Sequence, residues 1–531
     1  MTISGKQLIG GEWTAGDGGA FHAVNPTNGK RLMPAISIAS NRQVEAAVRM
    51  AEAASKKFKH TPLNVRADFL RSCADQIMEL GDELLERVSE ETGYPRARAE
   101  GERARTCNQL RMFASYIESG DYLDARIDTA LPDRQPLPRP DIRHINQPIG
   151  PVVVFGASNF PLAFSVAGGD TAAALAAGCP VIVKGHPAHP GTSELVAQAI
   201  AKAVNQADLP RGVFSFLIDQ GHAVGAQLVK APAVKAVGFT GSFAGGSALV
   251  ALANQRPDPI PVFAEMGSVN PMFLLPQALK NNAASLAAGF VSSFTMGSGQ
   301  FCVKPGLVFA VEGPHLEEFI AAASKLVADA APAVMLNDRI CDSFGKALDE
   351  RISAGDLQIL AQGKAPDGQK GFYSQVTLFG STAATILEKP ELLEETFGPA
   401  SIIIRCRDES EMLNAARKLP GQLTATLHGT EQELADFAAL ADQLVEMAGR
   451  LVVNGFPTGV EVCHSMVHGG PFPATSDARF TSVGTNAIMR FVRPVCYQNY
   501  PEALLPPALR NHNPLGITRL VNGVRTAEPI A

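Results

Sequence analysis

Apolar residues change their spacing along the chain, and each spacing predicts a different architecture. Within residues 41–118 they recur at helical intervals between charged side chains, which predicts a run of amphipathic helices. From 149 to 276, short β-branched runs alternate with alanine-rich segments. The runs predict strands at 152–155, 181–184, 213–217, 234–239 and 261–263. The alanine-rich segments predict helices at 162–177, 192–206, 223–230 and 245–254. Strand–helix units of this length predict a doubly wound parallel sheet.

A second α/β pattern covers residues 266–473. Its predicted strands are 307–311, 401–405, 425–428 and 451–454, and its predicted helices are 316–328, 409–418 and 432–447. Residues 475–531 contain many Pro and Asn residues and show little periodicity. Because such tails usually pack on another surface, we expect this one to take part in subunit contacts.

Length and charge narrow the class of protein. At 531 residues the chain is too long for one compact core. Its 46 basic and 52 acidic residues give a net charge of −6 without a dense basic block, which argues against nucleic acid as a partner. The N-terminus shows no secretory pattern. The long apolar stretch 151–183 is interrupted by Gly and Pro, so two buried strands around a helix explain it better than a membrane span.

The spacing of the cysteines does not indicate a metal site. All eight are scattered, and none has the close spacing of metal ligands. In a large chain without an export signal we expect them to be reduced, and no metal site is predicted. These features together predict a cytoplasmic protein.

Two segments at predicted strand ends suggest a nucleotide site, although the usual Gly-x-Gly-x-x-Gly is absent. Lys184 ends one strand, at the edge where ligands bind in such sheets. The segment 238–246, Gly-Phe-Thr-Gly-Ser-Phe-Ala-Gly-Gly, leads into a helix, and its small residues let backbone N–H groups and Ser242 approach a pyrophosphate. Taken alone, Lys184 is explained equally well as a strand end that reaches solvent. The segment 238–246, taken alone, is explained equally well as an ordinary glycine turn.

Cys302 is the candidate nucleophile. It follows Gly297 and Gly299 in a predicted loop, where a thiol can be exposed. Glu265, at the end of a predicted strand, is the candidate base. Most free cysteines are small buried hydrophobic residues, and a lone carboxylate at a strand end is more often structural, so neither residue identifies a site by itself.

Taken together, the motifs resemble the aldehyde dehydrogenase superfamily over nearly the whole chain. They follow that family's order: Asn-Phe-Pro-Leu (159–162), Val-Lys-Gly-His-Pro (183–187), Gly-Phe-Thr-Gly-Ser (238–242), Glu-Met-Gly (265–267), Gly-Gln-Phe-Cys (299–302) and Glu-Glu-Thr-Phe-Gly-Pro (394–399). The resemblance implies an α/β protein with a doubly wound cofactor-binding domain (1–124 and 148–265), a second α/β catalytic domain (266–474) and a small oligomerisation segment (125–147 and 475–531). It also implies a homodimer or homotetramer.

The resemblance assigns expected roles to single residues. Cys302 is the expected nucleophile, Glu265 the general base, and Asn159 with the Cys302 backbone N–H the oxyanion hole. The expected cofactor contacts are Lys184 and Glu395 at ribose hydroxyls, Ser242, Gly241 and Gly246 at the pyrophosphate, and Phe397 behind the nicotinamide ribose.

The implied reaction oxidises an aldehyde to a carboxylate with NAD(P). The Cys302 thiolate adds to the carbonyl, hydride loss from the thiohemiacetal leaves a thioester, and Glu265 activates the water that hydrolyses it. We therefore expect Glu265 to be mobile and not rigidly salt-bridged. A cysteine hydrolase or acyltransferase is the alternative from another class, with His464 or His468 as the base and no nicotinamide. A non-catalytic relative would be expected to lack Cys302, Glu265 or Asn159.

The sequence departs from common members of the family at two places. Ser158 stands where a Trp often precedes the asparagine, and the loop 468–477 lacks the usual Gly-Gly-Tyr/Phe-Lys-x-Ser-Gly. Both differences resemble the subgroup of 2-oxoglutarate semialdehyde (2,5-dioxopentanoate) dehydrogenases and certain fatty-aldehyde dehydrogenases. An oxo-carboxylate needs a cation, whereas an acyl chain needs an uncharged tunnel.

Arg105 favours the semialdehyde, because its helix corresponds to one that lines the substrate tunnel in the family. Phe160 is the second expected substrate contact. The alternative for Arg105 is a solvated or salt-bridged helix arginine.

The residues after Lys184 bear on cofactor choice. Many NAD-preferring members carry an acid three residues after the lysine, where it repels a 2′-phosphate. That position is Pro187, with His186 nearby as an expected cofactor contact, so we expect NADP, with NAD allowed. His222 stands where an arginine clamps the phosphate in some relatives, which weakens this preference.

Overall fold

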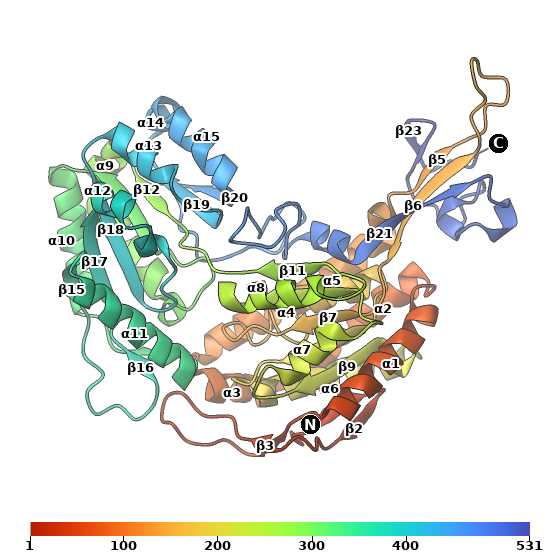
Figure 1. Cartoon of the computed structure of the whole chain (residues 1–531), viewed down its shortest axis with the longest axis horizontal. Coiled ribbons are helices and arrows are strands. Elements are labelled where there is room, and N and C mark those ends of the chain that lie inside the picture. Colours follow the sequence, from red (N-terminus) through yellow and green to blue (C-terminus); the bar gives the residue numbers. More distant parts are fainter. Residues whose placement is uncertain (1, 531) are drawn as a thin grey trace.

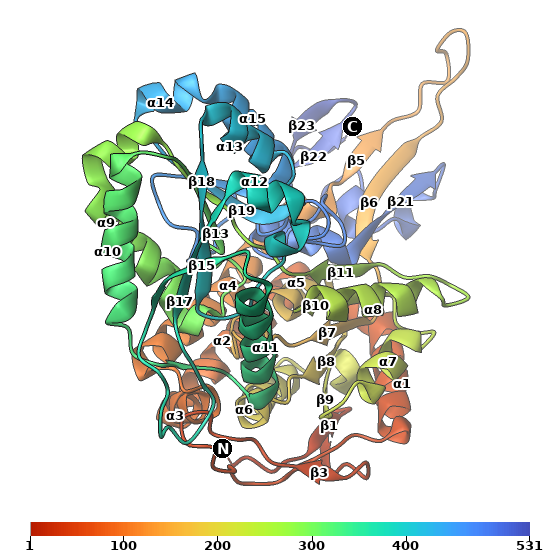
Figure 2. The same cartoon turned by 60° about the vertical axis from the view of Figure 1, so that its left-hand side comes forward.

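The computed structural model describes residues 2–530, which form an α/β protein (Figure 1). Two large sheets, each covered by helices, make up the body, and a smaller sheet projects from it (Figures 1 and 2). Among the described residues, no helix is both long and apolar enough to cross a membrane.

The first sheet is the doubly wound sheet that the sequence predicts. Its order is β11-β10-β7-β8-β9-β1-β2; the strands from β11 to β9 run parallel, and β1 and β2 are antiparallel additions. The strands are β1 (Gln7–Ile9), β2 (Glu12–Thr14), β7 (Val152–Phe155), β8 (Val181–Gly185), β9 (Phe214–Ile218), β10 (Ala236–Thr240) and β11 (Val262–Glu265).

Both faces of this sheet are buried, because alternate residues of a strand point to opposite sides. Val152 and Val154 pack into one core, and Val153 packs into another. The first core is covered by α2 (Leu63–Glu79), α3 (Gly81–Thr92), α4 (Arg96–Ser119), α5 (Gly169–Ala177) and α6 (Pro190–Gln206). The second is covered by α1 (Asn41–Phe58), α7 (Ala223–Lys230) and α8 (Phe243–Asn254).

Helix α5 is shorter than the sequence pattern predicts. It starts at Gly169, not at 162, and turns occupy residues 161–167. The buried carboxylate of Glu102 accepts hydrogen bonds from the backbone N–H groups of Leu162 (2.8 Å) and Ala163 (3.0 Å). Small apolar residues suit a buried turn as well as a helix, so the alanine-rich pattern hides the break. This turn follows directly on Asn159.

The second sheet has the order β15-β17-β18-β13-β12-β19-β20, parallel except for β15. Its strands are β12 (Met272–Leu274), β13 (Leu307–Val311), β15 (Gln358–Gln362), β17 (Thr377–Thr382), β18 (Ala400–Cys406), β19 (Gln422–His428) and β20 (Ala448–Val453). One face packs on α9 (Pro276–Thr295) and α10 (Pro314–Ala328). The other packs on α11 (Asp338–Ala354), α12 (Ala383–Glu388), α13 (Glu409–Ala416), α14 (Glu431–Asp436) and α15 (Ala438–Met447).

The sequence pattern misses several elements of this half. It does not predict β12, β15, β17, α9 or α11, and the helix predicted at 432–447 is broken at Phe437 into α14 and α15. In α9 the backbone of Asn282 is non-helical, which interrupts the periodicity of that helix.

The projecting sheet joins segments far apart in the sequence, in the order β21-β6-β5-β22-β23 (Figure 1). Its strands are β5 (Arg126–Asp128), β6 (Ile142–Pro148), β21 (Val492–Gln498), β22 (Arg519–Val521) and β23 (Val524–Thr526). The tail that lacks periodicity in the sequence therefore contains strands. Two further pairs complete the structure: β3 (Ala20–Phe21) with β4 (Ile36–Ser37), and β14 (Ala333–Val334) with β16 (Tyr373–Ser374).

Candidate active site

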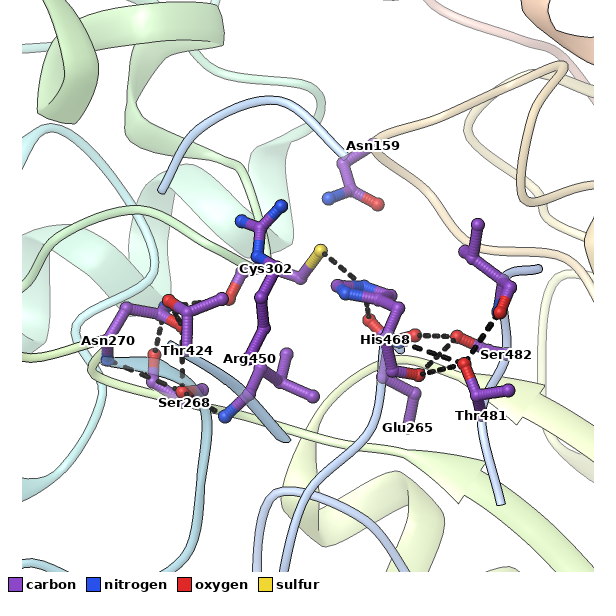
Figure 3. A network of polar contacts seen from close by, with 12 residues as sticks. Asn159, Glu265, Ser268, Asn270, Cys302, Thr424, Arg450, His468, Thr481 and Ser482 are labelled. Carbon is purple, nitrogen blue, oxygen red and sulfur yellow. Dashed lines mark hydrogen bonds and ion pairs between the residues drawn. The ribbon is translucent and has the colours of Figure 1, made fainter. Parts of the chain in front are cut away.

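Segments from both large sheets meet at Cys302 (Figure 3). Glu265 is the last residue of β11, and Cys302 lies between the 3₁₀ turn Met296–Gly299 and β13. His468 lies in the long segment after β20, which returns to the first sheet, where Thr475 bridges to Glu265. His468 and Glu265 are 203 positions apart, so only the tertiary fold assembles this cluster.

The backbone before Cys302 is tightly constrained. Gly297, Ser298 and Gly299 have φ values of 57°, 59° and 67°, in the left-handed region that favours glycine. A Cβ atom at Gly299 would lie 2.3 Å from the carbonyl oxygen of Gly398. The nucleophile loop therefore packs directly on the segment 394–399, and two motifs that are separate in the sequence form one unit.

A buried hydrogen-bond network supports Cys302 from below. Asn270 Nδ2 donates to the carbonyl oxygens of Cys302 (2.8 Å) and Lys304 (3.0 Å), and Asn270 Oδ1 accepts from the Thr424 hydroxyl (2.9 Å). Asn270 and Thr424 are buried, where an unsatisfied polar group costs about 1–3 kcal/mol. The network thus fixes the backbone of the nucleophile. Asn270 was not predicted from the sequence, because the residues around it give no sign of this supporting role.

Asn159 faces the thiol from the turn that follows β7 (Figure 3). It is buried, and its Nδ2 donates to the carbonyl oxygen of Gln300 at 2.8 Å. An amide nitrogen carries two N–H groups, so the second can serve an oxyanion formed beside Sγ. The Asn159 carbonyl oxygen accepts from the Tyr94 hydroxyl (3.0 Å) and from Arg98 (3.1 Å), which holds the segment in place.

His468 lies between the thiol and the carboxylate. Its Nε2 is 3.5 Å from Cys302 Sγ and 2.8 Å from Glu265 Oε1, and the Ser482 hydroxyl donates to Glu265 Oε2 at 2.7 Å. The expectation that Glu265 is not salt-bridged is therefore wrong, since both of its oxygens are bound inside the protein, whereas its mobility stays a prediction. The other histidine considered, His464, is exposed and lies against Tyr116.

Burial dominates the ionisation of this cluster. Desolvation, with the Glu265 carboxylate nearby, raises the pKa of the Cys302 thiol well above its ordinary value. Burial also opposes ionisation of Glu265, yet His468 and hydrogen bonds from Ser482 and Cys302 leave the pKa of its carboxyl below the ordinary value. A protonated thiol thus sits beside an ionised carboxylate, and a base must remove the thiol proton before the sulfur can attack.

A buried ion pair lies at the carboxyl ends of β8 and β9. Lys184 Nζ is 2.9 Å from Asp219 Oδ1, and Asp219 Oδ2 accepts from the Val224 N–H at 3.1 Å. Asp219 was not predicted from the sequence, because only strand pairing brings it beside Lys184. Position 187 carries no acid, but Asp219 places a carboxylate beside the same lysine.

His186, the next predicted contact, is held by its neighbours. Its ring stacks on His189 with centroids 5.6 Å apart, and its Nδ1 accepts from the Ala188 N–H at 3.1 Å. Burial, with the charges of His189 and Lys184, lowers the pKa of His186 well below its ordinary value. A neutral imidazole offers no positive charge to a 2′-phosphate.

The segment 238–246 turns from β10 into α8 as predicted. Ser242 caps the helix, its Oγ accepting from the Gly245 N–H at 3.2 Å, and Gly241 and Ser242 are exposed. Phe243 and Ala244, the first two helical residues, are exposed as well, so this N-terminus is open to solvent, an arrangement that suits a phosphate. Gly246 is buried instead, and a Cβ atom there would lie 2.6 Å from Met266 Sδ. Close packing explains this glycine without a cofactor, and its contact with the pyrophosphate stays a prediction.

Glu395 lies against the Glu265–Gly267 turn. A Cβ atom at Gly267 would be 2.4 Å from Glu395 Oε2. Burial raises the pKa of this carboxyl to about 7, although nearby Lys304 opposes the shift. Phe397, two residues further on, is half-buried. Glu395 and Phe397 thus belong to the segment 394–399, which packs on the loop before Cys302.

Comparison with known proteins places this geometry in a family, since residues 13–471 match the aldehyde dehydrogenase family. The chain belongs to that family. It is 50% identical to alpha-ketoglutaric semialdehyde dehydrogenase 2 of Azospirillum brasilense, covering 98% of this chain and 99% of the relative. It is 48% identical to alpha-ketoglutaric semialdehyde dehydrogenase of Acinetobacter baylyi over the same shares. The crystal structure of PnpE from Pseudomonas sp. WBC-3 in complex with nicotinamide adenine dinucleotide shares the fold, with a TM-score of 0.80 at 22% identity, covering 93% and 97% of the two chains.

Family membership decides between two chemistries that the cluster allows. A cysteine beside a histidine also fits a cysteine hydrolase, and His468 at 3.5 Å from the thiol is in place for that role. In an aldehyde dehydrogenase the same thiol carries the substrate through oxidation, with a nicotinamide dinucleotide as cofactor. The protein therefore oxidises an aldehyde to a carboxylate.

Two arginines of this aldehyde dehydrogenase lie toward the thiol, one on a helix that covers the first sheet and one on a strand of the second sheet. On α4, Arg105 Nε and Nη2 are buried and find no hydrogen-bond acceptor among residues 2–530. On β20, Arg450 donates to the carbonyl oxygens of Pro457 and Gly459 and extends toward Cys302 (Figure 3). Burial lowers the pKa of both guanidinium groups, and ionisation of Cys302 would oppose that shift. Arg450 was not predicted from the sequence.

Aromatic rings form a wall beside Arg105. Phe160 packs against Phe164 and Phe301, with ring centroids 5.5 and 5.0 Å apart, and the Arg105 guanidinium lies 5.1 Å from the centre of the Phe164 ring. An apolar wall with an unpaired cation suits a small substrate with one charged end.

Replacing Gly299 with alanine should damage the site. The added Cβ atom would collide with the Gly398 carbonyl at a backbone conformation that alanine adopts at a cost of about 1–3 kcal/mol. We expect the variant to lose at least about tenfold in kcat/KM, measured with thermal unfolding. Gly345→Ala is the control, because no atom lies within 4 Å of its added Cβ. Wild-type kinetics and stability in Gly299→Ala would contradict the packing argument.

Proposed function

We propose that this aldehyde dehydrogenase oxidises 2-oxoglutarate semialdehyde (2,5-dioxopentanoate) to 2-oxoglutarate. The observation that carries the proposal is the buried guanidinium of Arg105, with Nε and Nη2 unpaired among the described residues. A 2-oxo acid ends in a carboxylate, which pairs with a guanidinium through two parallel hydrogen bonds. The names of the two full-length relatives at 50% and 48% identity support the same substrate.

A long-chain aldehyde, the alternative substrate, fits the site less well. An acyl chain would cover the Arg105 donors without pairing them, and each unpaired buried donor costs about 1–3 kcal/mol. The positive charge of Arg450 near the thiol adds to this penalty.

In the proposed reaction, the Glu265 carboxylate takes the Cys302 proton and passes it to solvent, and the thiolate forms a carbon–sulfur bond to the aldehyde carbon. Asn159 Nδ2 and the Cys302 backbone N–H donate to the resulting oxyanion. The bound nicotinamide dinucleotide supplies the hydride acceptor. Glu265 then deprotonates the water that attacks the thioester, and the Cys302 sulfur leaves as the carboxylate forms. Glu265 must leave its bonds to His468 and Ser482 for this step, so we assign it two positions.

The chain's own residues fit a nicotinamide dinucleotide. The exposed N-terminus of α8 at Gly241 and Ser242 offers N–H groups to a pyrophosphate, while Lys184 and Glu395 offer a donor and an acceptor to ribose hydroxyls. Phe397 is assigned to the back of the nicotinamide ribose.

For cofactor preference, the contacts of Lys184 argue against the NADP preference expected from the sequence. The Asp219 carboxylate beside Lys184 can accept from a 2′-hydroxyl and repels a 2′-phosphate, and His186 is neutral. We propose that NAD is used at least as well as NADP.

Asp219→Asn tests this preference. Removing the carboxylate charge should raise the ratio of kcat/KM with NADP to that with NAD by about tenfold, because a repulsion of about 1.4 kcal/mol is lost. Asp258→Asn, an exposed acid on the same half of the chain, should leave the ratio unchanged. If the ratio does not move in Asp219→Asn, Asp219 does not set the preference.

The substrate assignment is tested with 2,5-dioxopentanoate, glutarate semialdehyde and a long-chain aldehyde, each with NAD and NADP, by the absorbance of the reduced nicotinamide. We expect kcat/KM for 2,5-dioxopentanoate to exceed that for the long-chain aldehyde by at least about tenfold. The opposite order would overturn the assignment.

Cys302→Ala should abolish turnover while the cofactor still binds, and turnover retained in that variant would remove the mechanism.

Arg105→Ala tests whether Arg105 recognises the carboxylate of the substrate or only maintains the structure of the site. Losing hydrogen bonds to a charged group, worth about 1.5–3 kcal/mol, should lower kcat/KM for the semialdehyde about 10- to 100-fold, mainly through KM. An uncharged aldehyde should be affected much less. Arg111→Ala removes an exposed arginine from the same helix and serves as the matched control. Equal losses for both aldehydes would discard the role of Arg105.

We also propose that the projecting sheet, with segments 125–147 and 475–531, is the oligomerisation segment of a cytoplasmic homodimer or homotetramer. The parts of the chain around it expose large apolar side chains, including Leu137, Leu504 and Val524. All eight cysteines are free, as a reducing compartment requires. A solution mass of one 56.0 kDa chain would contradict the oligomer.

A further inference from the structure

Cys302, His468 and Glu265 bring three different metal-binding groups to one point (Figure 3). Their thiol, imidazole and carboxylate ligand atoms all lie within 4.8 Å of one another. Sequence spacing predicted no metal site, because His468 lies 166 positions from Cys302 and 203 from Glu265. We propose that this cluster binds one Zn²⁺ ion and that the bound ion reversibly switches the enzyme off.

The distances suit tetrahedral zinc. Bonds of about 2.3 Å to sulfur and about 2.0 Å to nitrogen or oxygen place a sulfur and a nitrogen ligand about 3.5 Å apart, and a nitrogen and an oxygen ligand about 3.3 Å apart. His468 Nε2 is already 3.5 Å from Cys302 Sγ. Its 2.8 Å contact with Glu265 Oε1 has to open by about 0.5 Å, as the ion takes the place of the hydrogen-bonding proton.

The charges favour a divalent ion of borderline softness. Zinc binding releases the thiol proton to solvent, after which the thiolate and the Glu265 carboxylate carry two negative charges in a buried place, and a dication neutralises both. A set of sulfur, nitrogen and oxygen ligands selects zinc over the hard ions magnesium and calcium. The positive charges of Arg105 and Arg450 oppose the ion, so the affinity is below that of a site without neighbouring cations.

Each ligand is positioned from outside the cluster. Asn270 holds the Cys302 carbonyl at 2.8 Å, Ser482 holds Glu265 Oε2 at 2.7 Å, and the His468 backbone N–H donates to the Thr481 hydroxyl at 2.8 Å. These contacts leave Sγ, Nε2 and Oε1 directed at one another. Zinc therefore meets three protein ligands with an open fourth position for water, on the side where Cys302 is partly exposed.

The consequence for catalysis is direct. Zinc binds the sulfur lone pair that attacks the aldehyde and the Glu265 oxygen that takes a proton from water, so neither step proceeds while the ion is bound. Zinc binding does not oxidise the sulfur, so a chelator that removes the ion restores the thiol. This inference rests on the aldehyde dehydrogenase chemistry of Cys302 but not on the choice of substrate or cofactor.

Co²⁺ is the probe, because it replaces Zn²⁺ in tetrahedral sites and reports its ligands by absorption. The full-length, chelator-treated, reduced enzyme is titrated with CoCl₂ without aldehyde or cofactor. We expect one equivalent to produce a thiolate-to-cobalt charge-transfer band, and Zn²⁺ to abolish it. Zn²⁺ should also block alkylation of Cys302 by iodoacetamide, and EDTA should restore it. Absence of the band, or alkylation unaffected by Zn²⁺, overturns the proposal even if the enzyme proves active on the expected aldehyde.

Two variants assign the ligands. His468→Phe removes the imidazole and should weaken Zn²⁺ binding at least about 100-fold. The control His464→Phe alters an exposed histidine of the same segment and should bind cobalt like the wild type. Glu265→Gln keeps the hydrogen-bonding shape but loses the charge, so it tests the site if His468→Phe does not fold. A cobalt band of unchanged affinity in both ligand variants would show that the ion binds elsewhere and would overturn the site.

Discussion

The hydrogen bond between His468 and Glu265 is the contact on which the site depends. It ties the segment that follows the second sheet to the last strand of the first sheet, and it sets the carboxylate beside the thiol of Cys302. Both partners are buried, so the bond is formed where water does not compete with it. The same bond restrains the group that we propose as the activator of water, so the proposed reaction requires Glu265 to move.

Around this contact the protein separates rigid from adjustable parts. The nucleophile backbone is fixed by the left-handed turn at Gly297–Gly299 and by the Asn270 network. Asn159 is fixed through its own carbonyl and through the Glu102 carboxylate, which holds the turn that follows it. The groups expected to meet ligands, Arg105 and the N-terminus of α8, keep donors unused by other parts of the described protein. Rigid support beneath the reacting atoms, with free donors around them, is what catalysis by preorganised groups requires.

Prediction from the sequence succeeded where one strand or helix carries the signal. Repeated strand–helix units located β7 and α7 to the residue, and the glycine-rich segments marked the start of α8 and the nucleophile loop. Prediction failed where composition suits two conformations, as in the turn at 162–168, and where a polar interruption hides a helix, as in α9. It also failed for the strands of the tail, because β21 alternates half-buried and exposed residues only over residues 495–498, which is too short to stand out in the sequence.

The sequence by itself determined the family and the doubly wound sheet, and it singled out Cys302, Glu265 and Asn159 as candidates, because each of these residues lies in a short contiguous motif. Only the tertiary structure decided which side chains surround them. Asp219 beside Lys184, Arg450 near the thiol and His468 on the Glu265 carboxylate come from segments that the chain order keeps apart. Their positions follow from strand pairing and from the packing of two sheets, and such long-range contacts leave no periodicity in the sequence.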